Sequence, residues 1–589
     1  MSLYQNRKIE YLKVYERLNT LYSAISIARL ASAVLLLVSL FYLIKTGAML
    51  LLIFAIIFLV CFLLLMKKHT QLSVQKRLNQ ALVKINSDED DYLNERSVPF
   101  ENGTAYQDFS HQYAYDLDIF GNHSLFQNLN RTTTFIGQKK LARQLLHTLS
   151  NEHILQNQQA VKELSTLLEW RHDFMALGKI SGDNQQQYET LLRWSRSENG
   201  KLPAFQVALA FAFPVILIST LAAYFITDNP FLIKIVSFLF AVNLFVLGLF
   251  FKRIKSEIQN ADGIDTIIGQ YSLIVDKIST QDFTAEKLIG LKQKLVTNDQ
   301  PSAVHLKKLS ALFSQMDSID NLVSTVLFNG FFLYHVHVLK MLLHWKKQHA
   351  LNLETWLDVI GEFEMLNSLA NFSYNNPDFV FPILNSDFKI NFSNLSHPLL
   401  NKNTRIGNDI DFKPQFMVLT GSNMSGKSTF LRSLGINMVL AGTGSAVCAT
   451  AANVHPMPVL VSMRLSDSLS DSESYFYAEI KRLKQIMDQL QNQRAFVLLD
   501  EILRGTNSDD KRSGTIGVVR KMVQNKAIGA IATHDVEVCL TTSEFPEVLT
   551  NKCFEAQIIN DDLFFDYKLR DGICQNKSAT FLMKKMEII

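Results

Sequence analysis

The chain has 589 residues, a formal net charge of +3 and a hydrophobic share of 48%. A charge so close to neutral gives no argument for nucleic-acid binding. The five cysteines show neither the paired spacing of a metal site nor a disulfide framework. The length leaves room for several domains.

Two long apolar stretches lie close together near the N-terminus. The first runs from about Ile25 to Ile44 and the second from Ala48 to Met66, with Lys45-Thr-Gly47 between them. A helix needs about 20 apolar residues to cross a bilayer, and the long side chain of Arg29 can reach the interface. The sequence therefore predicts a cytoplasmic N-terminal segment over residues 1–24 and transmembrane hairpin 1 over residues 25–66.

A polar segment follows the first hairpin. The stretch from Asn86 to Gln107 contains Pro99 and Gly103, two residue types that interrupt regular structure. We therefore expect residues 67–109 to form a linker to the next domain.

A second pair of apolar runs lies further along the chain. Residues 204–226 are followed by the turn Thr227-Asp-Asn-Pro230 and by residues 231–251. The alternative is that all four runs are buried helices of a soluble core, but four nearly chargeless runs in two tight hairpins disfavour it. The sequence predicts transmembrane hairpin 2 over residues 204–251, and hence a multi-pass membrane protein with four spans.

Positive charges set the expected orientation of both hairpins, because cytoplasmic loops carry an excess of lysine and arginine. Lys67 and Lys68 follow the second span and three basic residues follow the fourth, whereas the two hairpin turns carry only Lys45. All long segments are then expected in the cytoplasm, where ATP is. In a bacterium the membrane would be the inner, cytoplasmic one.

A glycine-rich loop near the C-terminus is the most informative motif. It follows the apolar run 416–419, expected to be a buried strand, and precedes a helical pattern starting at Phe430. Such a loop binds phosphate through backbone N–H groups, a lysine that reaches the β- and γ-phosphates, and a hydroxyl that binds Mg²⁺. The residues expected to contact ATP are Gly421, Ser422, Asn423, Met424, Ser425, Gly426, Lys427, Ser428 and Thr429.

Two further apolar runs end in polar residues. Residues 495–499 lead to Asp500 and Glu501, and residues 528–532 lead to Thr533 and His534. An acid at such a strand end can hold Mg²⁺, so Asp500 and Ser428 are the predicted metal ligands, while Glu501 can orient the attacking water. His534 can bond the γ-phosphate or that water. The alternative is a buried strand whose polar end meets solvent.

These segments together resemble the MutS-type branch of the ABC ATPases. The family loop GPNMxGKST corresponds to 421–429, its DEIGRGTSTxDG to 500–511, and its ATH to 532–534. The signature region corresponds to 467–480. Weaker similarity extends upstream, so that the resemblance covers roughly residues 110–200 and 255–589.

The resemblance implies an α/β P-loop (ABC-type) ATPase domain over 386–589. An all-α core and lever-like domain over 110–203 and 252–385 precedes it, interrupted by hairpin 2. It also implies ATP and Mg²⁺ as cofactors and a homodimer through the ATPase domains. Ser474, the expected signature serine, would meet the partner's nucleotide; alternatively it caps a helix.

The chain also departs from the family. Mismatch-reading members insert a phenylalanine from an N-terminal F-x-E motif into the base stack, whereas the F-x-E here is Phe545-Pro-Glu547. We expect no N-terminal mismatch and connector domains. Leu503 and Lys511 stand where the family has glycines.

Two functions remain open on this basis. The first is a DNA-associated ATPase held at the membrane, since the family binds mismatched DNA in mismatch repair. The second is a membrane ATPase that has lost DNA binding and drives a conformational change in its hairpins or in a protein partner. A transporter is disfavoured, because the spans carry almost no polar residues to line a path.

Overall fold

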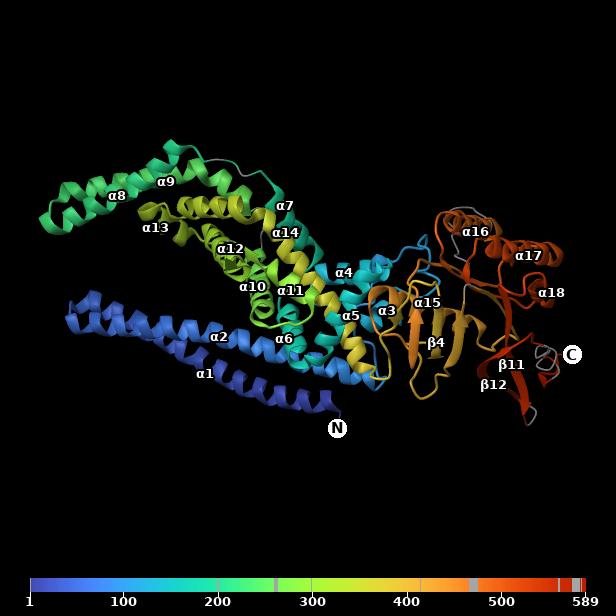
Figure 1. Ribbon diagram of the computed structural model, residues 1–589. Coiled ribbons are helices and arrows are strands. Elements are labelled where there is room, and N and C mark those ends of the chain that lie inside the picture. The colour runs from blue at the N-terminus through green and yellow to red at the C-terminus, as the bar shows by residue number, and fades with distance from the viewer. Residues whose placement is uncertain are drawn as a thin grey trace.

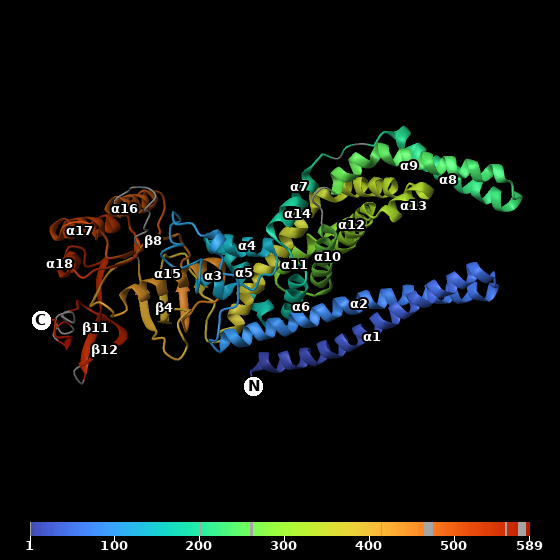
Figure 2. The same cartoon turned by 180° about the vertical axis from the view of Figure 1, so that it is seen from behind.

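The computed structural model describes residues 2–198, 200, 202–258, 263–297, 299–413, 415–464, 475–559, 562–574, 583 and 585–588. The chain up to Asn375 is mostly helical, and an α/β region follows it, as the sequence predicts. Two helical hairpins project from one end of the elongated molecule, and the α/β region forms the other end (Figure 1). The view from behind shows the same separation (Figure 2).

Hairpin 1 consists of α1 (Leu3–Thr46) and α2 (Met49–Leu93). Its turn is closed by Gly47, whose φ of 68° lies in the left-handed region that glycine adopts readily. The linker predicted over residues 67–109 is wrong for its first part, because α2 continues without a break to Leu93. Leu82 and Ile85 on this extension pack against Met175 of the helical body, and this burial keeps the polar segment helical.

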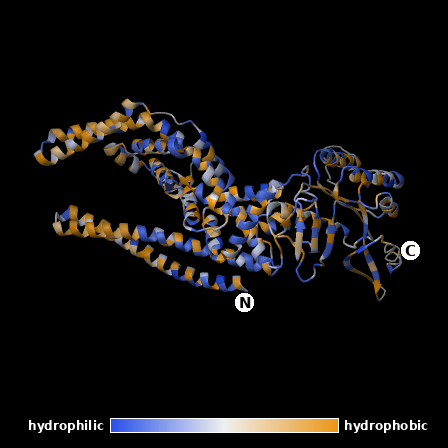
Figure 3. Ribbon diagram, viewed as in Figure 1, coloured by the Kyte–Doolittle hydropathy of each residue, from blue (hydrophilic) through white to orange (hydrophobic). Residues whose placement is uncertain are grey.

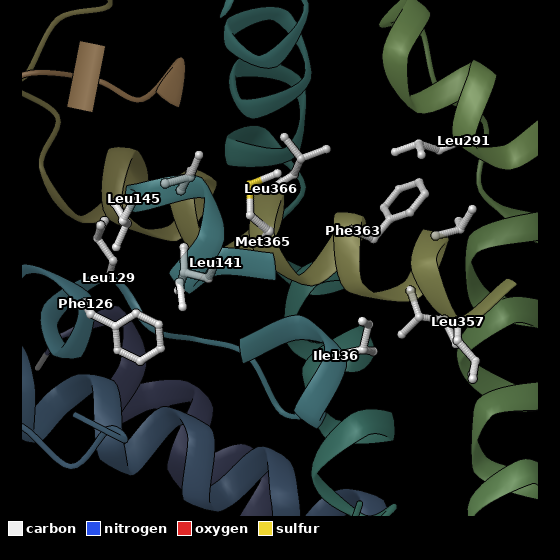
Figure 4. Packing of buried hydrophobic residues seen from close by; sticks show 14 of the residues in the cluster. Phe126, Leu129, Ile136, Leu141, Leu145, Leu291, Leu357, Phe363, Met365 and Leu366 are labelled. Carbon is white, nitrogen blue, oxygen red and sulfur yellow. The ribbon is translucent and has the colours of Figure 1, made fainter. Parts of the chain in front are cut away.

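The helical body surrounds one long helix, α14 (Tyr334–Asn375, 42 residues). Its Leu357, Phe363 and Leu366 pack against side chains of α3, α4 and α11 (Figure 4). The other helices are α3 (Leu125–Leu129), α4 (Phe135–Leu145), α5 (Asn151–Thr166), α6 (Leu168–Lys179), α7 (Gln185–Arg196), α10 (Ile264–Thr280), α11 (Glu286–Gln293), α12 (Ser302–Asp317) and α13 (Leu322–Phe332). The small strands β1 (Val296–Thr297) and β2 (Gln300–Pro301) form a separate pair.

Hairpin 2, made of α8 (Ala204–Thr227) and α9 (Pro230–Ile258), interrupts this body. In the described part of the chain, α1, α2, α8 and α9 are long and apolar enough to cross a membrane. A bent pair, α13 and α14, passes the same test when its two helices are taken together, with a bend of 86°. Hydrophobic residues cover the outer parts of both hairpins (Figure 3).

The α/β region contains two sheets. A four-stranded sheet has the order β3-β7-β4-β5, formed by β3 (Ile383–Leu384), β4 (Ile390–Leu395), β5 (Asn408–Phe412) and β7 (Ala451–Val454). A six-stranded sheet has the order β12-β11-β6-β10-β9-β8, formed by β6 (Phe416–Gly421), β8 (Val459–Ser462), β9 (Phe496–Asp500), β10 (Ile528–Ala532), β11 (Leu549–Ile559) and β12 (Asp562–Asp571). The associated helices are α15 (Lys427–Thr443), α16 (Tyr475–Asn492), α17 (Ser508–Gln524) and α18 (Val536–Leu540).

Candidate functional site

The three strands that carry the predicted site residues are neighbours in the six-stranded sheet. β10 is parallel to both β6 and β9, and its Ala532 lies opposite Leu419 on one side and Asp500 on the other. All three strands are buried along their length, which is why they appear in the sequence as continuous apolar runs. Their carboxyl ends meet at one edge of the sheet, where parallel α/β sheets place their ligand sites.

The glycine-rich loop connects β6 to α15 at this edge. The helix begins at Lys427, three residues before the predicted start at Phe430. Gly426 caps it with a φ of 101°, and a Cβ there would lie 3.0 Å from the ring of Tyr567. Both observations require glycine at this position. The loop therefore ends at the N-terminus of a 17-residue helix, whose first N–H groups have no partner within the helix.

Lys427 is buried across the base of this loop. Its Nζ donates hydrogen bonds to the carbonyl oxygens of Gly421, at 2.8 Å, and Ser422, at 3.1 Å. Burial lowers the pKa of Lys427, and the carboxylates of Glu501 and Asp500 oppose this shift. The lysine thus faces both strand-end acids from the loop.

The structure brings the two predicted metal ligands together. Ser428 Oγ donates a hydrogen bond to Asp500 Oδ2 at 2.6 Å. The other carboxylate oxygen, Asp500 Oδ1, is buried and has no hydrogen-bond partner in the protein. Burial raises the pKa of Asp500, and the bond from Ser428 counteracts this. Among the residues that the structure describes, no group of three or more histidine, cysteine or acidic side chains could hold a metal ion by itself.

Glu501 and His534, the two predicted catalytic residues, are in direct polar contact through Glu501 Oε1 and His534 Nε2. The hydrogen bond with His534 is the main cause that lowers the pKa of Glu501 to about 2. Arg504 adds to this, with its Nη2 at 3.8 Å from Glu501 Oε2. The carboxylate therefore stays charged throughout the physiological pH range.

The remaining predicted contacts surround this cluster. Ser422 and Ser425 are buried, and their hydroxyls have no hydrogen-bond partner in the protein. Met424 is exposed with a positive φ, and Asn423 and Thr429 are also exposed. Ser474 lies outside the described residues.

Sequence reasoning missed two residues that hold the acids in place. Glu479 on α16 accepts hydrogen bonds from the backbone N–H groups of Leu503, at 2.8 Å, and Arg504, at 3.2 Å. Arg504 in turn donates from Nε to the Glu501 carbonyl oxygen at 2.9 Å and from Nη2 to that of Asp500 at 3.2 Å. Both residues lie within the family motifs quoted above, and their place in those motifs was the one sequence signal that could have pointed to their role.

Leu503 shows why the family has a glycine at this position. Its φ is 62°, in the left-handed region, where side chains other than glycine are strained. The two hydrogen bonds to Glu479, together with burial of the Leu503 side chain, hold the leucine in this conformation.

Comparisons with known proteins agree with this geometry. Residues 417–587, which contain the six-stranded sheet from β6 onward and the glycine-rich loop, match the family model of MutS domain V. This part of the chain is thus similar to the C-terminal α/β domain of MutS proteins.

Several curated relatives match the chain over a longer stretch than the family model. A DNA mismatch repair protein MutS of Methanococcoides burtonii is 32% identical over 38% of this chain and 26% of its own length. That of Thermotoga petrophila is 29% identical over 38% of this chain and 29% of its own length. The human MutS protein homolog 4 is 28% identical over 38% and 24%. The C-terminal part of the chain is therefore similar to proteins of the MutS family, and the chain spans 24–29% of the length of these relatives.

Proposed function

We propose that the chain is a membrane-anchored ATPase of the MutS type, which binds ATP with Mg²⁺ at the glycine-rich loop and hydrolyses it. One observation carries this proposal. Lys427, the Ser428–Asp500 pair and the Glu501–His534 pair lie at the carboxyl ends of three adjacent parallel strands, where the loop after β6 leads into the N-terminus of α15. A triphosphate needs these groups in this arrangement.

Phosphate binding would fall to the loop and Lys427. The loop N–H groups and the helix N-terminus attract negative charge. The Lys427 ammonium, now bonded to two loop carbonyls, would exchange these acceptors for phosphate oxygens. The unpartnered hydroxyls of Ser422 and Ser425 are further donors within the same loop.

Ser428 and Asp500 fit a Mg²⁺ ion. Mg²⁺ takes oxygen ligands and usually combines one or two protein groups with waters and substrate phosphates. Asp500 offers a buried oxygen, Oδ1, that has no other partner, and this also fits the absence of a self-sufficient metal cluster among the described residues. When bound, Mg²⁺ would neutralise charge on the phosphates.

Glu501 is suited to orient a water molecule for attack. Its charged carboxylate is a hydrogen-bond acceptor, and His534 and Arg504 fix its position. With a pKa of about 2 it is a weak base, so its contribution comes from holding the water in line and not from taking its proton at an early stage.

Nucleotide binding by the full chain in detergent tests the site. Lys427→Ala should abolish Mg²⁺-dependent ATP binding, because no other described side chain replaces its charge within the loop. Lys484→Ala is a matched control, since Lys484 is exposed and pairs with the exposed Asp488 on α16. The proposal is wrong if Lys427→Ala and Lys484→Ala bind ATP equally well.

The membrane and the homodimer are part of the same proposal. Four helices of suitable length and composition support anchoring, and the distribution of positive charges favours a cytoplasmic position for the α/β region. The family resemblance supports a homodimer in which Ser474 of each subunit completes the site of the other.

DNA is the partner that the relatives favour, because they are described as DNA mismatch repair proteins. The second candidate function is an ATP-driven conformational change of the hairpins. The contacts of α14 with both hairpins favour it. This helix contacts hairpin 1 through Asn375, which accepts a hydrogen bond from Tyr4 at 2.7 Å. It contacts hairpin 2 through Lys346, whose Nζ lies 3.5 Å from Glu257 Oε2.

Binding of duplex, mismatched and branched DNA at two salt concentrations separates the two candidates. A DNA-associated ATPase should bind with a steep salt dependence, because phosphate contacts release counterions. A mechanical ATPase should show no such binding, and the distance between fluorophores on the two hairpins should change with ATP.

A further inference from the structure

The short helix α13 exposes a large apolar surface beside hairpin 2. Val323, Leu327 and Phe328 are about half exposed or more, although α13 has only 11 residues. At about 1.5 Å per residue its length is roughly 16 Å, too short to cross a hydrocarbon core of about 30 Å. An exposed apolar face of this kind requires a partner.

The C-terminal end of α13 contacts the middle of α9. The Asn243 side chain, fully buried within α9, donates a hydrogen bond from Nδ2 to the Gly330 carbonyl oxygen at 2.8 Å. The Phe240 ring lies so close to Gly330 that a Cβ on this residue would overlap it. The chain then turns by 86° at Leu333 and continues as α14. This turn, the hinge, therefore lies against α9 well away from its ends.

The segments on both sides of the hinge contact the same end of α9. On one side, Asp320, just before α13, forms an ion pair with Lys255. On the other side, Lys346 on α14 pairs with Glu257. Lys255 and Glu257 lie at the C-terminal end of α9, the end expected in the cytoplasm. The bent pair thus enters and leaves on one side, so it is not a span broken by a kink.

The depth of the hinge follows from its contact with Asn243. Phe251 is the last apolar residue before the basic end of α9, and Asn243 lies about 12 Å further along the helix toward the outer turn. The hinge is then about 12 Å inside an apolar layer of about 30 Å. On this basis we propose that α13 and the hinge form a re-entrant element that dips into the membrane from the cytoplasmic side, with its exposed apolar face against lipid acyl chains. This inference rests on the proposed membrane anchoring of hairpin 2.

The polar groups at the hinge are consistent with such a position, because non-helical backbone at membrane depth is tolerated only where the protein itself supplies partners. The Leu333 N–H bonds the Asn329 carbonyl oxygen at 3.0 Å, and the His335 N–H bonds Asn329 Oδ1 at 3.0 Å. Asn329 Nδ2 donates to the Thr325 carbonyl oxygen at 2.7 Å. Asn243 supplies the donor for Gly330. The backbone groups named here at the hinge therefore have hydrogen-bond partners within the protein.

Photo-cross-linking to lipid tests the re-entrant element. The full chain is placed in nanodiscs of a phosphatidylcholine and phosphatidylglycerol mixture, with a photoreactive residue at one position, and lipid adducts are identified by mass spectrometry. The test position is Phe328 on α13, 51% exposed. Phe238 on α9, 68% exposed, reports the anchoring of hairpin 2, and Leu351 on α14, 93% exposed, reports the aqueous side.

We expect adducts at Phe328 and Phe238 at comparable yield and at least tenfold less at Leu351. Adducts at Phe238 without adducts at Phe328 would overturn the re-entrant element and leave the membrane anchoring intact. No adducts at either position would overturn the anchoring, and the inference with it. Adducts at all three positions at equal yield would show that labelling does not follow depth along α14, and would overturn the depth assigned here.

Discussion

Replacing Arg131 by methionine should loosen the joint between hairpin 1 and α14. Glu89, near the end of α2, accepts hydrogen bonds from Nε and Nη2 of Arg131. It also accepts one each from Asn371 and Asn375 of α14, both at 3.0 Å. These contacts attach the base of the hairpin to the helix that leads into the α/β region.

The magnitude follows from burial. The side chains of Arg131 and Glu89 are 2% and 1% exposed, so removal of the cation leaves a buried carboxylate whose remaining hydrogen bonds come from the neutral side chains of Asn371 and Asn375. Breaking a buried ion pair on one side costs about 3–5 kcal/mol. The double variant Arg131→Met with Glu89→Gln removes both charges of this pair, and we expect it to recover part of this loss.

Amide hydrogen exchange of the last turns of α2 is the appropriate assay, because a chain with several domains does not unfold in a single transition and exchange reports local opening. Protection of residues 86–93 should fall roughly 100-fold to several thousand-fold in Arg131→Met. Arg196→Met is the control, since the Arg196–Glu354 pair is exposed on both sides. If both variants leave the protection of α2 unchanged, the assigned role of the buried pair is wrong.

Three further predictions concern topology, assembly and pH. A cysteine at Thr46, in the turn of hairpin 1, should react with an impermeant thiol reagent in intact cells, and one at Ala105 should not; the reverse pattern would invert the orientation. A Lys427→Ala chain and a Ser474→Ala chain should each be inactive as homodimers. Mixed dimers should regain up to about half of the ATP turnover, because one of their two composite sites is intact. If the two sites are shown to work independently and mixed dimers still recover no turnover, a shared site is contradicted. Because the pKa of Glu501 is lowered to about 2, its carboxylate loses its charge only as the pH falls toward that value. The ratio of wild-type to Glu501→Gln turnover should therefore stay constant from pH 8 to pH 5.5. A tenfold fall in this ratio over that range would contradict the assigned charge.

The strands and the loop of the candidate site could be predicted because their signals are local. Each strand is a continuous apolar run with a polar residue at its end, and parallel strands bring those ends together. The pairing of Glu501 with His534 follows from this arrangement. The hydrogen bonds that Glu479 and Arg504 make with the backbone could not be predicted in the same way, because they depend on the backbone conformation of the loop at Leu503.

The polar end of α2 and the helix α13 were missed for a different reason. The polar residues around Glu89 suggest a solvent-exposed linker. The structure instead buries Glu89 in an ion pair with Arg131, which lies in a different segment of the chain. The apolar run of α13 is too short for a span and is interrupted by Asn329 and Gly330, whose partners are on α14 and α9. In both cases the structure depends on contacts between distant parts of the chain.

The hydrolysis step provides the most direct test of the account. Mg²⁺-dependent ATP turnover is measured for the full chain in nanodiscs, together with ATP binding, for the wild type and for Glu501→Gln. The account predicts that the variant binds ATP as the wild type does but turns it over about 10²- to 10⁴-fold more slowly, because the attacking water loses its charged acceptor. Equal turnover in the two proteins, or a wild type that binds ATP without hydrolysing it, would contradict the account.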